Sequence, residues 1–292
     1  MLSHEGPTPI GITMVPTDQT IEMAELARAV EDRGLAGLYL PDHSHIPVAR
    51  TSPYPLGGAL PARYTRLLDP FVALALAAAA TTRIRLGTAV LLAAQRDPIV
   101  TAKALATLDQ QSGGRVVVGV GFGWNAEEMA DHGVDPKRRR GRLREHVQAM
   151  RRLWEDDVAS YSGRYVEIAP SWSWPKPPQR PLPVLVGGAA SPTVFEHIVD
   201  YAQGWMPLGR RAIREGLPQL RDKVSEAGRD PADLEVISLV GAKVDQNILD
   251  AVEASGATSI LVDVLPGPRD SVLSKLDVLA EVVAARGGAA GG

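Results

Sequence analysis

Strand and helix signals alternate along this chain from end to end, and this alternation is what most limits its fold. Short apolar segments typical of buried strands are separated by segments in which apolar residues recur at helical spacing. The expected strands are residues 10–14, 35–40, 84–90, 116–120, 184–186, 204–206, 234–240 and 259–264. Eight strand–helix pairs predict an α/β fold, a TIM-type (β/α)8 barrel with loop insertions. An open doubly wound sheet is the alternative.

The expected helices have residues with known capping behaviour at their ends. Asp97 precedes Pro98, so a side-chain acceptor is followed by proline at the first helical position. Gly113 can take the left-handed conformation that ends a helix. The expected helices are 18–33, 70–82, 99–111, 138–155, 192–201, 210–227, 247–254 and 271–285, with a small hairpin near 161–168. We expect a single barrel domain over residues 1–286 and a disordered tail over 287–292.

The composition excludes several classes of protein. The 292 residues include 45% apolar and 22% charged residues, as in ordinary globular proteins, and the net charge of −3 gives no general attraction to nucleic acid or anionic membranes. The absence of cysteine excludes disulfides, thiolate nucleophiles and cysteine-based metal centres. The chain has no run of about 18 uncharged apolar residues and no secretory pattern, so we expect a cytoplasmic protein.

A glycine-rich loop follows the apolar strand expected at 116–120. Its sequence is GFGWNAEE, and it would lie at the carboxyl end of a strand, where barrels place their active sites. A G-x-G-x-G pattern begins at Gly119, but Trp124 stands where the dinucleotide fingerprint requires its third glycine. Residues 121–137 also do not open directly into a convincing helix. A Rossmann-type site is therefore not expected.

Several motifs occur in a specific order: LPDH at 40–43, RIRLGTAVL at 83–91, RDP at 96–98, TLDQQSGGRVVVGVGFGWNAEE at 107–128 and VGG followed by a helix at 186–201. Together they resemble the bacterial luciferase-like superfamily, and most closely its oxidoreductases that use the deazaflavin coenzyme F420. The resemblance implies a barrel, usually homodimeric, with the cofactor at the carboxyl ends of the strands. It implies hydride transfer between F420 and a small organic substrate. An FMN-dependent luciferase-like monooxygenase is the alternative.

The resemblance also implies which residues contact the cofactor. The matching positions are Asp42, His43, Ala89, Val90, Leu92, Gly121, Phe122, Gly123, Gly187, Gly188, Ala189, Ala190 and Ser191. The Ala89–Val90 bond matches a non-proline cis peptide in relatives, a bulge that backs the middle ring. Residues 187–191 match the phosphate-binding segment. Small residues there allow close approach of the backbone, and the helix that follows would donate the N–H groups of Thr193 and Val194.

His43 and Glu127 are the candidate acid/base residues. His43 would protonate the substrate as hydride arrives or polarise a carbonyl, although it could instead be a turn residue satisfied by the backbone. Glu127 would be a second acid/base or a cofactor contact if buried, and otherwise a solvated loop carboxylate. Asp42 would orient His43 or simply close the turn. His43, His45 and Asp42 lack a fourth donor at close spacing, so no metal site is expected.

Aromatic residues in the long loops 41–67 and 170–183 and in the glycine-rich loop are candidates for the substrate pocket. They are Tyr54, Tyr64, Trp124 and Trp172. Aromatic walls suit planar apolar ligands, and ordinary loop packing is the alternative interpretation.

Departures from the family pattern bear on the substrate and cofactor. Sugar-phosphate dehydrogenases of the family have a glutamate proton acceptor where this chain has Trp124, and asparagine where it has Glu127, which argues against sugar-phosphate oxidation. Flavin-dependent luciferases tend to have a phosphate-binding arginine where this chain has Phe122, which favours F420. The basic run at 137–144 is interpreted as a solvated helix start, from which one arginine could reach the cofactor's phosphate or tail. Nucleic acid is not an expected partner.

Overall fold

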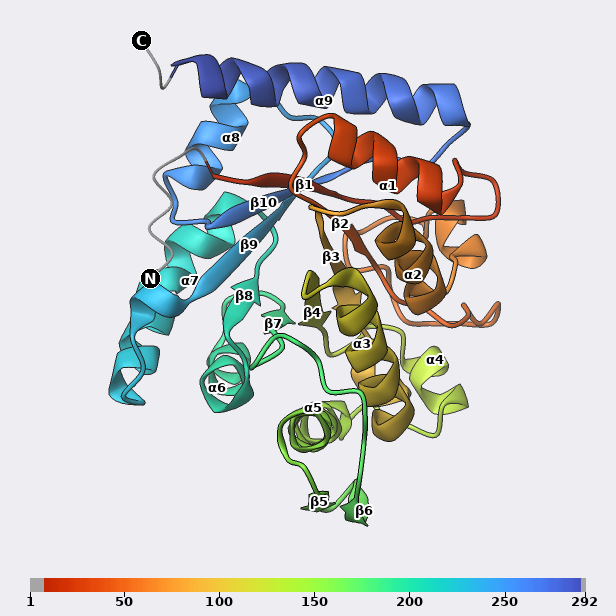
Figure 1. Cartoon of the computed structure of the whole chain (residues 1–292), viewed down its shortest axis with the longest axis vertical. Coiled ribbons are helices and arrows are strands. Elements are labelled where there is room, and N and C mark those ends of the chain that lie inside the picture. Colours follow the sequence, from red (N-terminus) through yellow and green to blue (C-terminus); the bar gives the residue numbers. More distant parts are fainter. Residues whose placement is uncertain (1–7, 290–292) are drawn as a thin grey trace.

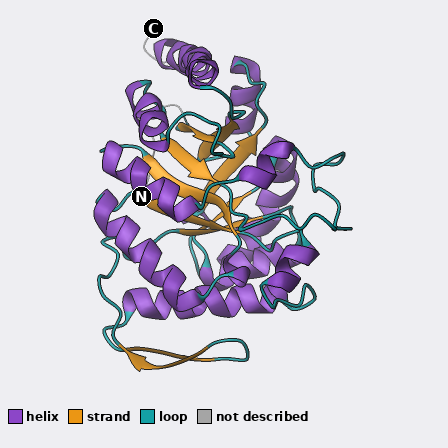
Figure 2. Ribbon diagram, turned by 90° about the vertical axis from the view of Figure 1, so that its right-hand side faces the viewer, coloured by secondary structure: helices purple, strands orange, loops and turns teal. Residues whose placement is uncertain are grey.

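A closed ring of parallel strands forms the centre of the molecule and helices surround it (Figures 1 and 2). The computed structural model describes residues 8–289. The ring order β1-β10-β9-β8-β7-β4-β3-β2 confirms the predicted TIM-type barrel and excludes the open sheet. The barrel strands are β1 (Ile10–Thr13), β2 (Gly37–Leu40), β3 (Arg85–Leu91), β4 (Val116–Val120), β7 (Val184–Gly187), β8 (Gly204–Met206), β9 (Glu235–Val240) and β10 (Ser259–Asp263).

Helices follow the strands in the expected alternation. The α-helices are α1 (Met23–Asp32), α2 (Pro70–Ala80), α3 (Pro98–Ser112), α4 (Ala126–Asp131), α5 (Arg139–Glu155), α6 (Pro192–Tyr201), α7 (Gly209–Glu226), α8 (Gln246–Glu253) and α9 (Arg269–Ala289). Short 3₁₀ turns are η1 (Ala62–Arg66), η2 (Ala93–Gln95) and η3 (Pro231–Asp233). Helix α9 includes residues 287–289, which were expected to be disordered, and residues 290–292 lie outside the described part of the chain.

The helix caps follow from local sequence, with two exceptions. Asp69 and Asp97 each accept two backbone N–H groups at the start of α2 and α3, as expected. Helix α1 begins later than expected because Thr20 donates to the Thr17 carbonyl oxygen and closes a separate turn. Helix α4 lies where no helix was expected, and Asn125 caps it. It has only six residues, too few for a periodic pattern to be read.

A hairpin of β5 (Ala159–Ser162) and β6 (Glu167–Ser171) lies outside the barrel, beyond α5 (Figure 1). The hydroxyl of Tyr161 donates to Gln148 of α5, which fastens the hairpin to that helix. The hairpin is therefore a separate two-stranded sheet and contributes no strand to the barrel. Within residues 8–289, no helix combines the length and apolar character that crossing a bilayer requires.

The inside of the barrel is filled by its own small core. Tightly buried residues of six strands make this core: Tyr39, Val117, Leu185, Met206, Ile237 and Leu261. Ala89, Val90 and Leu239 pack on it and remain partly exposed. A larger core lies between the strands and the helices. The barrel is thus a packed body, and chemistry can occur only at its ends.

The carboxyl end of β3 is irregular. Its pairing with β4 passes from Thr88 opposite Val118 to Leu91 opposite Val120, so β3 has one extra residue. The Ala89–Val90 peptide bond within this bulge is cis, which confirms the expectation.

Candidate active site

His43 lies directly after β2 at the carboxyl end of the barrel and is buried. Its Nδ1 is 2.6 Å from Oε2 of Glu128, and the indole Nε1 of Trp124 donates to its Nε2 over 3.2 Å. Because an indole N–H can only donate, His43 Nε2 must be the acceptor. The imidazole is therefore assigned as the neutral tautomer with its proton on Nδ1, donated to the carboxylate of Glu128.

Glu128 was not among the predicted site residues. It is buried on α4, and its second oxygen, Oε1, accepts the backbone N–H of Ser44 over 3.1 Å. The pattern Asn125-x-x-Glu128 is a capping box, which would normally turn the glutamate back to the helix start. Asn125 does cap the helix through the N–H of Glu128. The Glu128 side chain instead contacts His43. The Asn125-x-x-Glu128 pattern is therefore the sequence signal that could have pointed to Glu128 as the carboxylate partner of the histidine.

Glu127, the predicted second acid/base, faces the long loop rather than His43. Its Oε1 accepts the N–H and the hydroxyl of Thr51, over 2.6 and 2.8 Å, and the N–H of Ser52 over 3.3 Å. Hydrogen bonds from Ser52 and Thr51 lower the pKa of Glu127 to about 2. The structure thus makes Glu127 an anchor for the loop and places Glu128, not Glu127, beside His43.

Asp42 is buried, and its carboxylate is hydrogen-bonded to the Arg96 guanidinium. It therefore does not orient His43 through a hydrogen bond. The Arg96 guanidinium donates to both oxygens of Asp42 over 2.9 and 2.6 Å, and the Leu92 N–H donates to Oδ2 over 3.0 Å. Arg96 also donates to Asp69, the cap of α2. Although burial opposes it, hydrogen bonds to Asp42 and Asp69 raise the pKa of Arg96. This ionic cluster joins the ends of β2 and β3 beneath the site.

Three of the four predicted pocket residues surround His43. The ring centroids of Tyr64 and Trp124 lie 5.7 and 5.5 Å from that of His43, both edge-on. Tyr54 packs edge-on against Tyr64 and Trp124. Burial and the hydrogen bond from Tyr54 raise the pKa of Tyr64. Trp172 is not part of this group, because it follows β6 in the outer hairpin and is 80% exposed.

Several of the residues that were predicted to contact the cofactor ring lie around Val90. A Cβ atom added to Gly121 would come within 2.3 Å of Val90 Cγ2, and one added to Gly187 within 2.6 Å of Val90 Cγ1. Glycine is therefore required on both sides of the bulge. Gly123 has φ of +72°, and a side chain there would strike Met129. Leu92 is buried beside them.

The predicted phosphate segment runs from Gly187 to Ser191 and leads into α6. Gly188 has φ of +154°, and its carbonyl accepts the indole N–H of Trp205, while Ala189 and Ala190 are exposed. Ser191 Oγ accepts the N–H of Val194 over 3.3 Å, so that predicted donor is already bonded. Within the described chain, the N–H of Thr193 has no hydrogen-bond partner.

Phe122 is partly buried and packs against the larger core between the barrel and its helices. Its ring lies edge-on to His197 with centroids 4.9 Å apart, and the Arg140 guanidinium is 5.7 Å from its centroid. Arg140 of the basic run at 137–144 thus lies against Phe122 of the glycine-rich loop.

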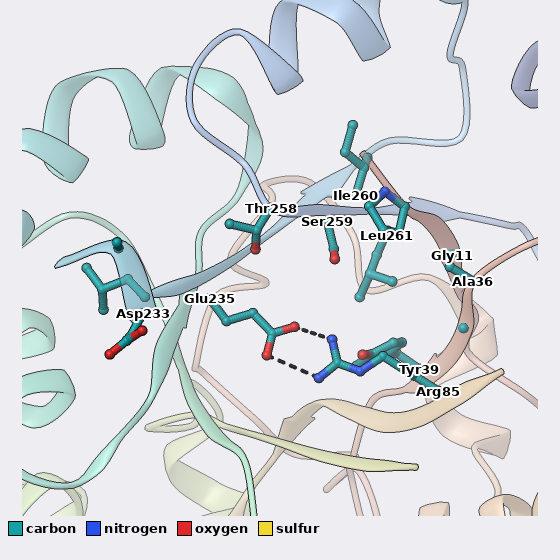
Figure 3. Close-up of a pocket in the computed structure, with 14 residues that line it drawn as sticks. Gly11, Ala36, Tyr39, Arg85, Asp233, Glu235, Thr258, Ser259, Ile260 and Leu261 are labelled. Atoms are coloured by element: carbon teal, nitrogen blue, oxygen red, sulfur yellow. Dashed lines mark hydrogen bonds and ion pairs between the residues drawn. The ribbon is translucent and has the colours of Figure 1, made fainter. Parts of the chain in front are cut away.

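A cavity of about 430 Å³ lies at the opposite end of the barrel (Figure 3). Its walls come from the amino ends of strands and include Gly11, Tyr39 and Leu261. Arg85 and Glu235 form an ion pair that borders it. His43 and its aromatic neighbours do not line this cavity. Residues at this end of a barrel usually serve stability, so the cavity is not the candidate active site.

The fold and this constellation at the carboxyl end of the strands define a barrel enzyme with a histidine–carboxylate pair under aromatic walls. The chain belongs to the luciferase-like monooxygenase family, whose pattern matches residues 7–280. It is 49% identical over 224 residues to an uncharacterized protein of Mycobacterium tuberculosis, covering 75% of this chain and 79% of that protein. It is 27% identical over 243 residues to an F420-dependent glucose-6-phosphate dehydrogenase of Kineococcus radiotolerans, covering 80% and 66%.

Solved structures share the fold. A monooxygenase, RslO1 from Streptomyces bottropensis, superposes with a TM-score of 0.77 at 23% identity, covering 95% of this chain and 99% of that one. An F420-dependent secondary alcohol dehydrogenase with an F420–acetone adduct gives 0.76 at 20% identity, covering 96% and 99%. At these identities the similarity concerns the barrel, and the family relation supports an enzyme of the oxidoreductase and monooxygenase type.

Proposed function

We propose that this chain is an F420-dependent oxidoreductase that moves a hydride between C5 of the deazaflavin and a small organic alcohol or carbonyl compound. The observation that carries the proposal is the hydrogen-bonded series Glu128–His43–Trp124 at the barrel mouth. It is a proton-transfer group held at the strand ends near the cis bulge. The F420-dependent relatives support this choice of cofactor over FMN.

The residues present fit such a cofactor. Glycines on both sides of Val90 keep the bulge clear for a flat ring, and the exposed backbone at 187–191 suits a phosphate at the start of α6. When bound, F420 supplies two-electron hydride chemistry, because it carries carbon where a flavin carries N5. The protein supplies orientation, a dry pocket and the proton transfer.

His43 would act through Nε2. In the assigned tautomer this nitrogen has a free electron pair, so it can take the proton of a substrate hydroxyl that displaces the Trp124 indole. Glu128 then faces an imidazolium, and the pair becomes a charge-assisted hydrogen bond. In the opposite direction, the protonated imidazole donates to the carbonyl oxygen as the carbon accepts hydride. Trp124, Tyr54 and Tyr64 would cover the reacting atoms from water.

The first test is a fluorescence titration of F420 and, separately, FMN with the purified protein. We expect saturable binding of F420, micromolar or tighter, and weaker binding of FMN. Reduced F420 is then screened against ketones and aldehydes, and oxidised F420 against alcohols. A preference for FMN together with oxygen consumption would indicate the monooxygenase instead.

The second test is a His43→Ala variant. We expect it to bind F420 like the parent and to lose turnover by about 10²- to 10⁴-fold, the usual contribution of a positioned acid or base. Turnover equal to that of the parent would refute the role of His43.

A further inference from the structure

Two histidines and the buried Glu128 converge beside the candidate active site. His45 comes from the loop after β2, whereas Glu128 and His132 belong to α4 and its C-terminal end. One ligand atom of each of the three residues lies within 4.8 Å of the other two. Ser44 Oγ is 2.8 Å from His45 Nδ1 and 2.6 Å from His132 Nε2, so both ring nitrogens point at one small region.

Asp131 sets the tautomer of His45. Its Oδ2 is 2.9 Å from His45 Nε2, and a carboxylate can only accept, so Nε2 carries the proton. The free electron pair of His45 is therefore on Nδ1, the atom that faces Ser44 and His132. Metal-binding histidines are commonly oriented by a carboxylate on the other ring nitrogen in this way. The arrangement thus prepares His45 as a ligand before any ion is present.

We propose that His45, His132 and Glu128 bind one divalent transition-metal ion, best suited to Zn²⁺, and that the ion competes with His43 for Glu128. Imidazole and carboxylate ligands suit zinc, and the Ser44 hydroxyl or a water would complete four positions. The side chain of His45 is 42% exposed, so an ion can enter from solvent, while that of Glu128 is 1% exposed and supplies the negative charge.

The competition follows from how Glu128 is shared. Oε2 is bonded to His43 and Oε1 to the Ser44 N–H. An oxygen that gives its electron pair to an ion becomes a weaker acceptor, so the Nδ1–H of His43 loses part of its partner. The binding claim is independent of the proposed function, whereas an inhibitory effect on turnover rests on it.

Calorimetric titration of ZnCl2 into the chelator-treated full chain, without a histidine tag, tests the site. We expect one ion per chain with micromolar affinity. His45→Gln and His132→Gln should each weaken binding at least tenfold, and Asp131→Asn severalfold through the tautomer. Asp135→Asn is the matched control, since this exposed carboxylate pairs with Arg138 and should leave affinity unchanged. The absence of binding, or equal affinity in the His45→Gln/His132→Gln double variant, would overturn the site.

The coupling to His43 has its own readout. In ¹⁵N-labelled protein, Zn²⁺ should shift the ring nitrogen and Nδ1–H signals of His43, whereas equimolar Mg²⁺ should not. The shift should be lost in His132→Gln, a residue that does not touch His43. Zinc binding that requires both histidines but leaves the His43 signals unchanged would refute the competition. Because these measurements need no substrate or F420, failure of the proposed function would not alter their result.

Discussion

At the scale of single residues, two adjacent glutamates have opposite tasks. Successive helix positions are about 100° apart, so Glu127 and Glu128 cannot face the same neighbour. Glu127 turns to the backbone at Thr51, and Glu128 turns to His43. The sequence pointed to Glu127 as a possible second acid/base and did not single out Glu128, because which glutamate meets His43 depends on how α4 docks against the loop after β2.

Replacing Glu128 by glutamine should separate its effect on chemistry from cofactor binding. The neutral amide stabilises a charged His43 less than the carboxylate does, so we expect kcat to fall by about 10²-fold while F420 affinity is unchanged. Steady-state kinetics would measure kcat, fluorescence titration would measure the F420 affinity, and ¹⁵N spectra of the His43 ring would report its tautomer. Glu127→Gln is the matched comparison, since it should leave the His43 tautomer as it is. An unchanged kcat in Glu128→Gln would contradict the role assigned to it.

At the scale of secondary-structure elements, the Asp42–Arg96–Asp69 cluster holds three segments together. It joins the end of β2, the cap of α2 and the turn before α3. Breaking a buried ion pair leaves one charge without a partner, which costs more than the pair itself contributes. The stability of the carboxyl end of the barrel therefore depends on the guanidinium group of Arg96.

An Arg96→Met variant should lose about 3–5 kcal/mol of unfolding free energy, because Asp42 would remain buried without its partner. Urea unfolding followed by circular dichroism would measure the loss. Arg83→Met is the control, because the Arg83 side chain is 71% exposed and should change stability little. Equal urea unfolding midpoints for the two variants would show that the Asp42–Arg96–Asp69 cluster does not stabilise the fold.

The contact between α5 and α6 should make stability depend on pH. Burial, with Arg144 and Arg140 nearby, lowers the pKa of His197 from 6.5 to about 4. The unfolded chain then binds more protons between these values, so stability falls as pH drops from about 6.5 toward 4. We expect up to about 2 kcal/mol of loss from this residue between pH 7 and pH 5. Urea unfolding at both pH values, compared with His197→Gln, would show a shallower dependence in the variant. An identical dependence would assign the loss to other groups.

The sequence was most informative where burial dictates composition. All eight barrel strands were predicted because strands covered on both faces are nearly pure apolar runs. The bulge at Ala89–Val90 was anticipated only through family resemblance. Helix α4 and the outward position of Trp172 were missed, since each depends on how distant segments pack. The sequence also did not predict that His45 and His132 lie close together, because this too depends on how distant segments pack.

At the scale of the whole molecule, one flank of the barrel is unusually apolar. Helix α2 has the sequence PFVALALAAAA, so it has no polar face to present to water. Val72 and Leu76 of α2 are exposed, as is Val100 of α3. Helices α2 and α3 lie side by side (Figure 1). We propose that this flank forms the homodimer interface that the family resemblance implies.

Charged substitutions on this flank should therefore dissociate the dimer. We expect the parent to have twice the chain mass by light scattering after gel filtration, and a Val72→Asp/Leu76→Asp variant to have the mass of one chain. Val278→Asp is the control, because this exposed valine lies on α9 at another side of the barrel. A parent with the mass of one chain would refute the interface.

The loop after β2 has a base that is hydrogen-bonded to α4 and a tip that is not. Its base is held by backbone contacts of Ser44, Thr51 and Ser52 with the glutamates of α4, while its tip turns at Gly57 and Gly58 without such ties. His43, bonded to Glu128 of α4, belongs to the base, and the wall formed by Tyr54 and Tyr64 belongs to the more distal part. Under the proposed function, changes in the distal segment would alter the substrate range and leave the reaction itself unchanged, so close relatives need not share a substrate.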